Sequence, residues 1–158
     1  MADMARAECP FCSTTVQQSA FRADDGFLAI YNIAPILPGH SLVLPRAHVA
    51  SVLTLDDADL AAFVLFARRI TRLLARAFAA DGFDWTIQDG RSAGQSVPHL
   101  HLHIIPRRTG DLPEPGDWYP VLVGGEREPI DSDSRSRLTA AEHARVTERL
   151  RALARRED

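Results

Sequence analysis

The stretch that decides the fold spans residues 99–105 and reads His99-Leu100-His101-Leu102-His103-Ile104-Ile105. In an extended strand, successive side chains point to opposite faces of the sheet. The three histidines are therefore expected on one face and the alternating apolar side chains on the other, toward the core. Gly94 precedes the segment and Pro106 follows it, as is typical of the turns that bound a strand. The pattern predicts a half-buried strand that Pro106 closes.

This histidine row could serve a metal, a covalent reaction or no chemistry at all. At about 3.3 Å of rise per residue, His99 and His103 lie about 13 Å apart, so only two neighbouring histidines could share one ion. An imidazole held through one nitrogen is a competent nucleophile through the other, and a flanking imidazolium can bind an anion. The row therefore favours attack on a phosphate group over the alternative, a polar strand face exposed to water.

The segment and its flanks resemble the histidine triad (HIT) superfamily of hydrolases and transferases. Its signature, three histidines alternating with apolar residues, is met throughout residues 99–105. Residues 88–97, QDGRSAGQSV, are similar to the fragile histidine triad branch, which cleaves dinucleoside polyphosphates. Residues 32–45, NIAPILPGHSLVLP, resemble the family segment that carries a ribose-contacting asparagine and a fourth histidine. The resemblance covers most of the chain.

The resemblance implies the roles of the catalytic residues. His101 is expected to attack the α-phosphorus and form a nucleotidyl-histidine intermediate, which water then hydrolyses to release AMP. His103 would contact the transferring phosphate, and His99 completes the triad. The amide of Gln88 would lie beside the scissile bridging oxygen. This assignment agrees with the chemistry of phosphoryl transfer, which depends mainly on positioning and on stabilising charge.

The resemblance also implies a substrate-binding set. Asn32 would contact the ribose, and His40 would orient the triad from behind. Gln95 and Ser96 would contact phosphate through their side chains or backbone. The loop that carries them is rich in glycine, so its backbone N–H groups could approach an anion closely. Without the triad beside it, the same loop would be interpreted as an ordinary surface turn.

The chain has two cysteines, in the segment Cys9-Pro10-Phe11-Cys12. A CxxC pair can bind zinc, exchange disulfides or have no special role. No strand pattern precedes this pair, which disfavours thioredoxin-type redox chemistry. The resemblance to some bacterial HIT proteins implies structural zinc bound by Cys9, Cys12, His48 and His99, which would hold residues 1–15 against the triad strand. The alternative is a buried, reduced pair without metal.

Composition limits the other function classes. The 158 residues contain 46% hydrophobic and 7% aromatic residues, which is typical of one globular domain, residues 1–158. The net charge of −3 predicts no basic surface for polymeric nucleic acid. No run of eighteen apolar residues predicts a membrane span, and the N-terminus lacks the apolar core of a signal peptide. With few cysteines, these features indicate a cytoplasmic protein.

The remaining sequence predicts an α+β scaffold. A long amphipathic helix is expected from an N-cap at Thr54 to near Gly82, with Leu60 and Val64 on its apolar face. Strands are expected at 20–22, 27–31, 41–44 and 85–88. A capping box at Thr139 predicts a peripheral C-terminal helix over 138–156. These elements form an antiparallel sheet with one dominant helix packed on it, as in the HIT fold, whose subunits usually pair as homodimers.

Residues 109–137 are rich in glycine, proline and acidic residues and predict a flexible loop. Trp118 and Tyr119 interrupt it and could stack on a nucleotide base or pack against the sheet or a partner subunit. The leading function is hydrolysis of diadenosine tri- or tetraphosphate, with Mg²⁺ complexed to the substrate as a further expectation. The alternatives are phosphoramidate or adenylate hydrolysis as in the HINT branch, phosphorolysis of the same dinucleotides, and nucleotide binding without turnover.

Overall fold

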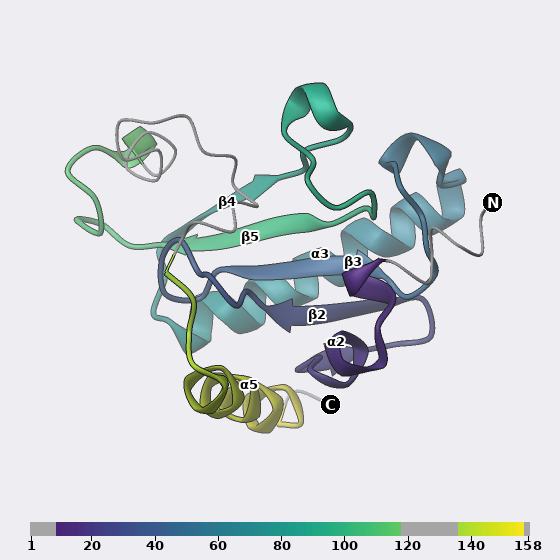
Figure 1. The fold of residues 1–158 in the computed structure, drawn as a ribbon. Coiled ribbons are helices and arrows are strands. Elements are labelled where there is room, and N and C mark those ends of the chain that lie inside the picture. Colours follow the sequence, from purple (N-terminus) through teal and green to yellow (C-terminus); the bar gives the residue numbers. More distant parts are fainter. Residues whose placement is uncertain (1–8, 118–135, 157–158) are drawn as a thin grey trace.

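A five-stranded antiparallel sheet forms the centre of the protein in the computed structural model, which describes residues 9–117 and 136–156 (Figure 1). Residues 1–8, Trp118, Tyr119 and the rest of 118–135 lie outside the described residues. The order of strands across the sheet is β1-β2-β3-β5-β4, and each neighbouring pair is antiparallel. The strands are β1 (Arg22–Ala23), β2 (Phe27–Tyr31), β3 (Ser41–Pro45), β4 (Gly82–Thr86) and β5 (Leu102–Arg107).

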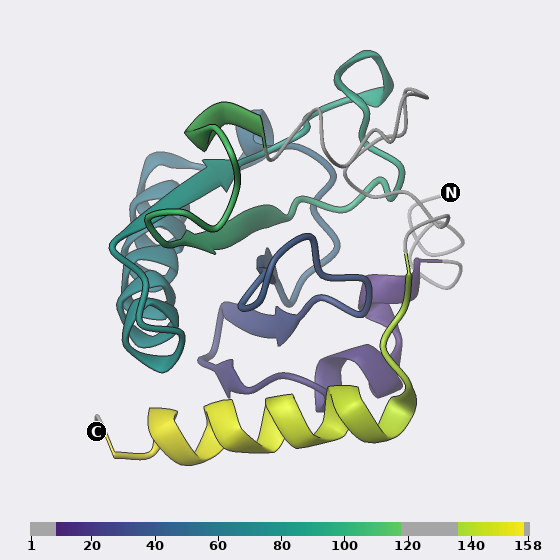
Figure 2. The same cartoon turned by 90° about the vertical axis from the view of Figure 1, so that its left-hand side faces the viewer.

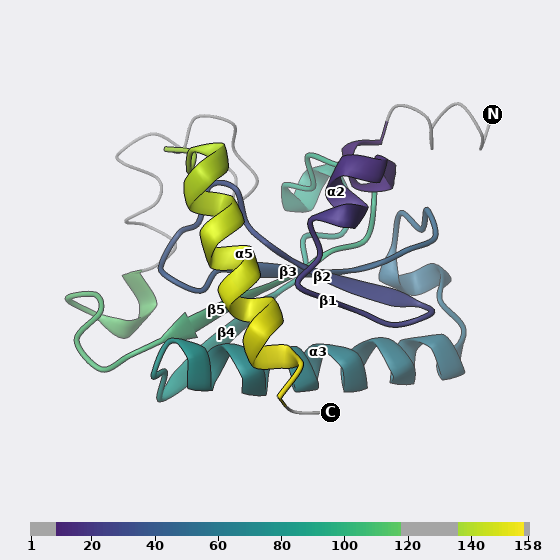
Figure 3. The ribbon, with the colours of Figure 1, turned by 90° about the horizontal axis from the view of Figure 1, so that it is seen from below.

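Helices cover both faces of this sheet. The long helix α3 lies on one face, and the short N-terminal helices η1 and α2 lie on the other (Figure 2). Helix α5 crosses the β1–β2 side of the sheet, between α3 and α2 (Figure 3). The expected α+β fold is confirmed. The helical elements are η1 (Pro10–Cys12), α2 (Thr14–Gln18), η2 (Val52–Thr54), α3 (Asp57–Ala77), η3 (Arg91–Ala93), η4 (Pro115–Asp117) and α5 (Ala140–Ala154).

Alternating side chains of the central strands divide the core into two layers. On the α3 side, Val43, Leu102 and Ile104 pack in the larger apolar cluster with the buried face of α3. On the α2 side, Ile30 and Leu42 belong to a smaller cluster that η1 and α2 cover. His103 pairs with Leu42 across the strands, so its side chain lies on the α2 side. The sheet therefore separates its main core from the histidines, as the alternating pattern predicts.

The triad strand begins later and ends later than predicted. β5 starts at Leu102, so His99 and His101 precede the strand, and it runs through Pro106 to Arg107. Pairing with β3 stops at Val43–Leu102. Beyond it, Pro45 has no N–H to donate to a ladder, and its carbonyl accepts a hydrogen bond from the His99 ring instead. Pro106 is tolerated because β3 pairs with β5 only as far as Ile104.

The ends of α3 also differ from the prediction. Its N-cap is Asp56, whose side chain accepts from the Asp59 N–H at 2.8 Å, rather than Thr54, which ends the preceding turn. The helix ends at Ala77 instead of near Gly82, because Ala79 adopts a left-handed conformation, with φ of 51°. Leu60 and Val64, expected on the apolar face, are 36% and 44% exposed. No described helix is long and apolar enough to cross a membrane.

The other elements follow the prediction with shifted bounds. β4 begins and ends earlier than the expected 85–88, and β1 overlaps the expected 20–22 only at Arg22. Both bonds of the predicted capping box between Thr139 and Glu142 are present at the start of α5. This helix lies at the outside of the fold, yet Leu150 is fully buried in the main core. One buried stripe is therefore enough to fix a helix that is otherwise polar.

Candidate functional site

His101 is held so that one ring nitrogen remains an acceptor. Its Nδ1 lies 2.6 Å from the backbone oxygen of His99, so Nδ1–H must donate to this carbonyl. The neutral ring then carries its lone pair on Nε2, which is the form required of a nucleophile. The side chain is 1% exposed, and its ring centroid lies 5.0 Å from that of His103. The geometry gives His101 a fixed tautomer beside a second imidazole.

A chain of hydrogen bonds fixes His103 through His40. The N–H of Ile36 donates to His40 Nδ1 at 3.1 Å, so the proton of the neutral His40 ring is on Nε2. His40 Nε2 lies 2.9 Å from His103 Nδ1 and donates to it. The neutral His103 ring then carries its own proton on Nε2, which makes this atom a donor. The arrangement suits contact with a phosphate oxygen, and both rings are fully buried.

Asn32 lies in the same network. Its Oδ1 accepts from the Ala34 N–H at 2.9 Å, so its Nδ2 lies 3.3 Å from His40 Nε2; both atoms carry hydrogen, so this contact is not a hydrogen bond. The backbone N–H of Asn32 also donates to the His40 carbonyl. Tyr31, the preceding residue, accepts from the Gly39 N–H through its hydroxyl at 3.1 Å. Asn32 and His40 are therefore brought together at the end of β2, where the sequence predicted a ribose contact and an orienting histidine.

His99 faces the N-terminal cysteines rather than the other two histidines. Its Nε2–H donates to the Pro45 carbonyl at 2.9 Å, which leaves Nδ1 as an acceptor. Burial lowers the pKa of His99, and His48 and His101 lower it further, against the raising effect of the Pro45 carbonyl. The neutral form is therefore favoured. A neutral imidazole whose far nitrogen donates to a backbone carbonyl is the usual form of a metal-ligating histidine.

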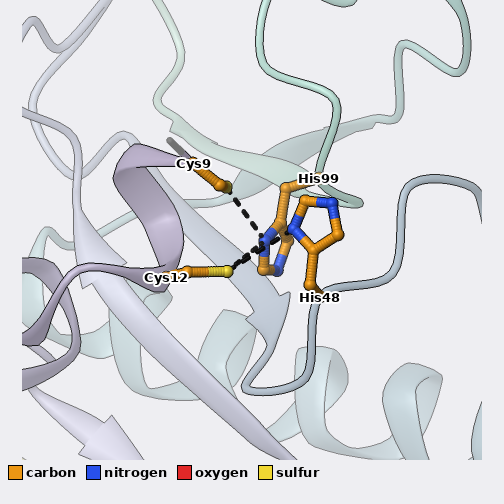
Figure 4. A group of neighbouring side chains, drawn as sticks. All are labelled: Cys9, Cys12, His48 and His99. Atoms are coloured by element: carbon orange, nitrogen blue, oxygen red, sulfur yellow. Dashed lines mark hydrogen bonds between the residues drawn. The ribbon is translucent and has the colours of Figure 1, made fainter. Parts of the chain in front are cut away.

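The ligand atoms of the four predicted metal residues converge on one point (Figure 4). These residues are Cys9, Cys12, His48 and His99, and their ligand atoms all lie within 4.8 Å of one another. The side chains come from η1, from the segment after β3 and from the segment before β5. Cys9 and His99 are buried, and neither cysteine is in a disulfide. The sequence thus identified a group that the fold assembles from three distant segments.

The spacing of these atoms fits a tetrahedral ion. Zinc bonds of about 2.3 Å to sulfur and about 2.1 Å to nitrogen, at tetrahedral angles, separate S and N ligands by about 3.6 Å. In the structure, Nδ1 of His99 lies 3.4 Å from Cys9 Sγ and 3.6 Å from Cys12 Sγ. Nδ1 of His48 lies 3.5 Å from Cys12 Sγ. The donor set and these three spacings match those of a tetrahedral zinc ion.

Phe11 connects this cluster to the nucleophile. It lies between the two cysteines, and its ring meets the rings of His99 and His101 edge-on, with centroids 5.7 Å and 5.2 Å away. Phe11 also lines a cavity on the α2 side of the sheet. Sequence reasoning treated the segment only as a source of thiols and missed this residue. The sequence feature that could have indicated its role is the position of an aromatic residue between two metal-ligand candidates.

The glycine-rich loop fixes the side chain of Gln88. Gln88 is 7% exposed, and its Nε2 donates to the Ala93 carbonyl at 2.9 Å. Its Oε1 is buried and accepts no hydrogen bond from the described residues. Gly94 has a φ of 95°, and a Cβ at this position would lie only 2.4 Å from Gln88 Nε2. Glycine is therefore required here for its conformation and for the close approach of Gln88.

Gln95 serves the loop itself. Its Oε1 accepts from the Gly90 N–H at 2.8 Å, and its Nε2 donates to the Ala50 carbonyl at 2.9 Å. The backbone N–H of Gln95 also donates within the loop, to the Gly90 carbonyl at 3.1 Å, so a phosphate contact by Gln95 would require one of these bonds to break. Asp89, which the sequence analysis missed, accepts from Ser51 Oγ and Val52 N at 3.0 and 2.8 Å. The loop is thus fixed to the segment before α3.

A cavity of about 440 Å³ adjoins the triad through Phe11, whose ring contacts His101, and its volume is within the usual range for small-molecule sites. Asn32 and Ser96 lie in its wall, and Leu42, which pairs with His103, lines it from the sheet. Its other walls come from α2, from the segment before the triad and from the beginning of α5. Apolar atoms make up most of the lining. The cavity can hold a flat, apolar group next to the triad.

Comparisons with known proteins agree with this geometry. A sequence model of the HIT domain matches residues 13–110, well over half of the chain. The chain belongs to the HIT domain family. Over 113 residues it is 39% identical to a bis(5'-adenosyl)-triphosphatase of Dictyostelium discoideum, covering 72% of this chain and 75% of that protein. Over 98 residues it is 41% identical to an asymmetrical bis(5'-nucleosyl)-tetraphosphatase of Schizosaccharomyces pombe, covering 62% and 54%.

A solved structure of this HIT fold provides a comparison for the metal cluster. The crystal structure of a zinc-bound histidine triad family protein from Mycobacterium smegmatis matches with a TM-score of 0.67 and 27% identity. The match covers 97% of this chain and 99% of the other. The comparison therefore includes the HIT domain and the C-terminal segment that follows it.

Proposed function

We propose that this HIT protein hydrolyses dinucleoside polyphosphates at the α-phosphorus through a nucleotidyl-His101 intermediate. The observation that carries the proposal is the hydrogen bond from His101 Nδ1 to the His99 carbonyl, which leaves Nε2 as an acceptor in a buried site. The relatives named for diadenosine triphosphate and dinucleoside tetraphosphate hydrolysis support the choice of substrate class. The chemistry of the site and the family point to the same bond.

In the first step, the lone pair of His101 Nε2 attacks the α-phosphorus. An N–P bond forms as the P–O bond to the bridging oxygen breaks, and its electron pair leaves with the nucleoside polyphosphate. We propose that His103 Nε2–H donates to a non-bridging oxygen, since its bond with His40 leaves the proton on Nε2. His40 keeps the proton on that atom and acts as a positioning residue, and Asn32 beside it is the proposed ribose contact.

In the second step, water attacks the phosphorus of the intermediate. The N–P bond breaks, its electron pair returns to His101 Nε2, and the proton of the water passes to solvent as AMP forms. Gln88 remains our proposed amide beside the bridging oxygen. Its buried Oε1 has no partner among the described residues, so it is also suited to orient the water. Gln95 and Ser96 remain the proposed phosphate contacts; Gln95 would have to exchange one of its bonds within the loop for the bond to phosphate.

The direct test is product analysis with diadenosine tetraphosphate. We expect the wild-type protein to release AMP and ATP, and His101→Ala to release neither. His101→Ala should still bind AMP, because the cavity walls remain. AMP production by His101→Ala at the wild-type rate would refute the role of this histidine. Tight binding of AMP without product from the wild-type protein would favour a nucleotide-binding module instead.

The Cys/His cluster is proposed to bind structural zinc through Cys9, Cys12, His48 and His99. The tetrahedral spacing and the zinc-bound relative support this assignment. When bound, zinc would link η1 to the segment before the triad by coordination. His101 is not among the proposed ligands. Metal analysis of the purified protein should find one zinc per chain, and Cys12→Ala should lose it together with thermal stability. Unchanged metal content in Cys12→Ala would refute the site.

We also propose a homodimer formed along β4 and α3. β4 is an edge strand, and Phe83 on it is 53% exposed. Leu60 and Val64 are exposed on the stripe of α3 that includes Thr71, which bonds to Trp85 of β4. Sedimentation equilibrium should give twice the chain mass, and Phe83→Glu should halve it; a monomeric wild type would contradict the proposal. A cytoplasmic location and Mg²⁺ complexed with the substrate remain our proposals.

A further inference from the structure

One wall of the cavity beside the triad comes from a segment that the family match does not include. The HIT domain match ends at residue 110, whereas α5 begins at Ala140. Ala140 and His143 nevertheless line the cavity, opposite residues of the sheet and of α2. The N–H of Leu138 donates to the Ile33 carbonyl at 2.8 Å and holds the beginning of α5 against the Asn32 segment. This wall is a feature of the chain rather than of the matched domain.

His143 is the polar side chain that α5 contributes to this wall. Its Nε2 lies 2.9 Å from the Tyr31 carbonyl, which can only accept, so Nε2–H donates to it. In the neutral ring the lone pair is then on Nδ1. Among the described residues, no hydrogen bond reaches this Nδ1. The ring is half-buried, and the Tyr31 carbonyl holds it in one orientation at the cavity.

Much of the remaining lining cannot distinguish one base from another by hydrogen bonding. Phe11, Val16, Ile30 and Leu42 present apolar surface, which accepts the flat face of any base. The lining also contains the polar residues Thr15, Ser19 and Arg137, and Asn32 and Ser96 are the proposed ribose and phosphate contacts. His143 Nδ1 is the acceptor that the α5 wall offers to a base bound in this cavity, next to the segment that carries Asn32.

We propose that His143 is a specificity-determining residue that selects adenine by accepting a hydrogen bond from its 6-amino group. The proposal rests on the proposed function, because it takes the cavity as the site of the nucleoside next to the triad. Adenine offers an amino donor at position 6, whereas hypoxanthine and guanine offer a carbonyl oxygen there. Two acceptors facing each other lose a hydrogen bond on both sides, so 6-oxo purines are disfavoured.

The test compares AMP with IMP, which replaces the 6-amino group by a carbonyl. Isothermal titration of the full-length protein measures binding alone, so the result does not depend on turnover. We expect AMP to bind about tenfold more tightly than IMP, the effect of one unmatched hydrogen bond in a partly exposed site. Equal affinities, or no binding of either nucleotide, would overturn the proposal. Absence of hydrolysis with the AMP preference intact would instead refute the proposed function.

Two substitutions separate the proposed contact from the anchoring bond. His143→Asn places an amide oxygen near the position of Nδ1 and should keep the preference for AMP. His143→Gln retains a donor for the Tyr31 carbonyl but loses the acceptor at Nδ1, and should bind AMP and IMP with similar affinity. Full retention of the preference in His143→Gln would overturn the proposal. A purely structural effect would lower the affinities for AMP and IMP equally. Thermal unfolding of each variant checks that it is folded.

Discussion

Replacement of Gly94 by alanine tests how the loop positions Gln88. The structure predicts two separate penalties. A residue with a side chain is strained at a φ of 95°, at about 1–2 kcal/mol. The new Cβ would also lie 2.4 Å from Gln88 Nε2 and displace a side chain whose buried hydrogen bond to the Ala93 carbonyl contributes about 1 kcal/mol.

Together these effects should lower the free energy of unfolding by about 2–3 kcal/mol, or lower Tm by about 4–12 °C. Gly110→Ala is the matched control, because Gly110 also has a positive φ, of 79°, but a methyl group added there would meet no atom within 4 Å among the described residues. It should show the strain penalty alone and leave dinucleotide hydrolysis unchanged. Gly94→Ala should in addition reduce kcat, because Gln88 has moved.

A double-mutant cycle decides whether the effect passes through Gln88. In a Gln88→Ala background the obstructing amide is absent, so Gly94→Ala should then cost only about as much as Gly110→Ala. The measurements are urea unfolding and steady-state hydrolysis of diadenosine tetraphosphate for the four proteins of the cycle. Additive effects of the two substitutions on both stability and kcat would refute this reasoning.

Three further perturbations address the neighbouring groups. His40→Ala should lower kcat on the order of 100-fold, because His103 loses its fixed orientation. An unchanged kcat would show that His40 does not position His103 for catalysis. Phe11→Ala should lower kcat/KM about tenfold with zinc content unchanged, whereas Phe11→Leu should retain most activity. The Arg107 side chain lowers the pKa of Asp111 to about 2, so the ion pair should stabilise the fold by about 1–2 kcal/mol above pH 4 and lose this effect as the pH falls through 2. Asp111→Asn should abolish this acid dependence in thermal unfolding, and an identical pH profile would contradict the assignment.

The sequence was most predictive where one periodic pattern and one chemical motif coincide. Alternation over residues 99–105 correctly separated the apolar side chains from the histidines, even though only His103 of the triad lies within β5. The cysteine motif identified thiols that converge with His48 and His99. Such features are local in sequence and need few assumptions about tertiary structure.

The errors arose where tertiary contacts override local preference. The start of β5 is set by the missing N–H of Pro45 and by the His99 ring, which are partners from distant segments. The end of α3 depends on a left-handed Ala79, whereas such positions usually carry glycine. The contribution of His143 to the cavity was not predicted, because no periodicity places the first turn of α5 against β2.

The most direct test of the central claim is capture of the covalent intermediate. The protein is mixed with diadenosine tetraphosphate, quenched within a single turnover at neutral or basic pH, digested and analysed by mass spectrometry. We predict one adenylyl group on the peptide that contains His101, located on its imidazole and absent from His101→Ala. The mechanism would be contradicted by complete turnover with no nucleotidyl-protein at any time point, together with inversion of configuration at the α-phosphorus. Inversion would mean that water displaces the leaving group directly, in one step.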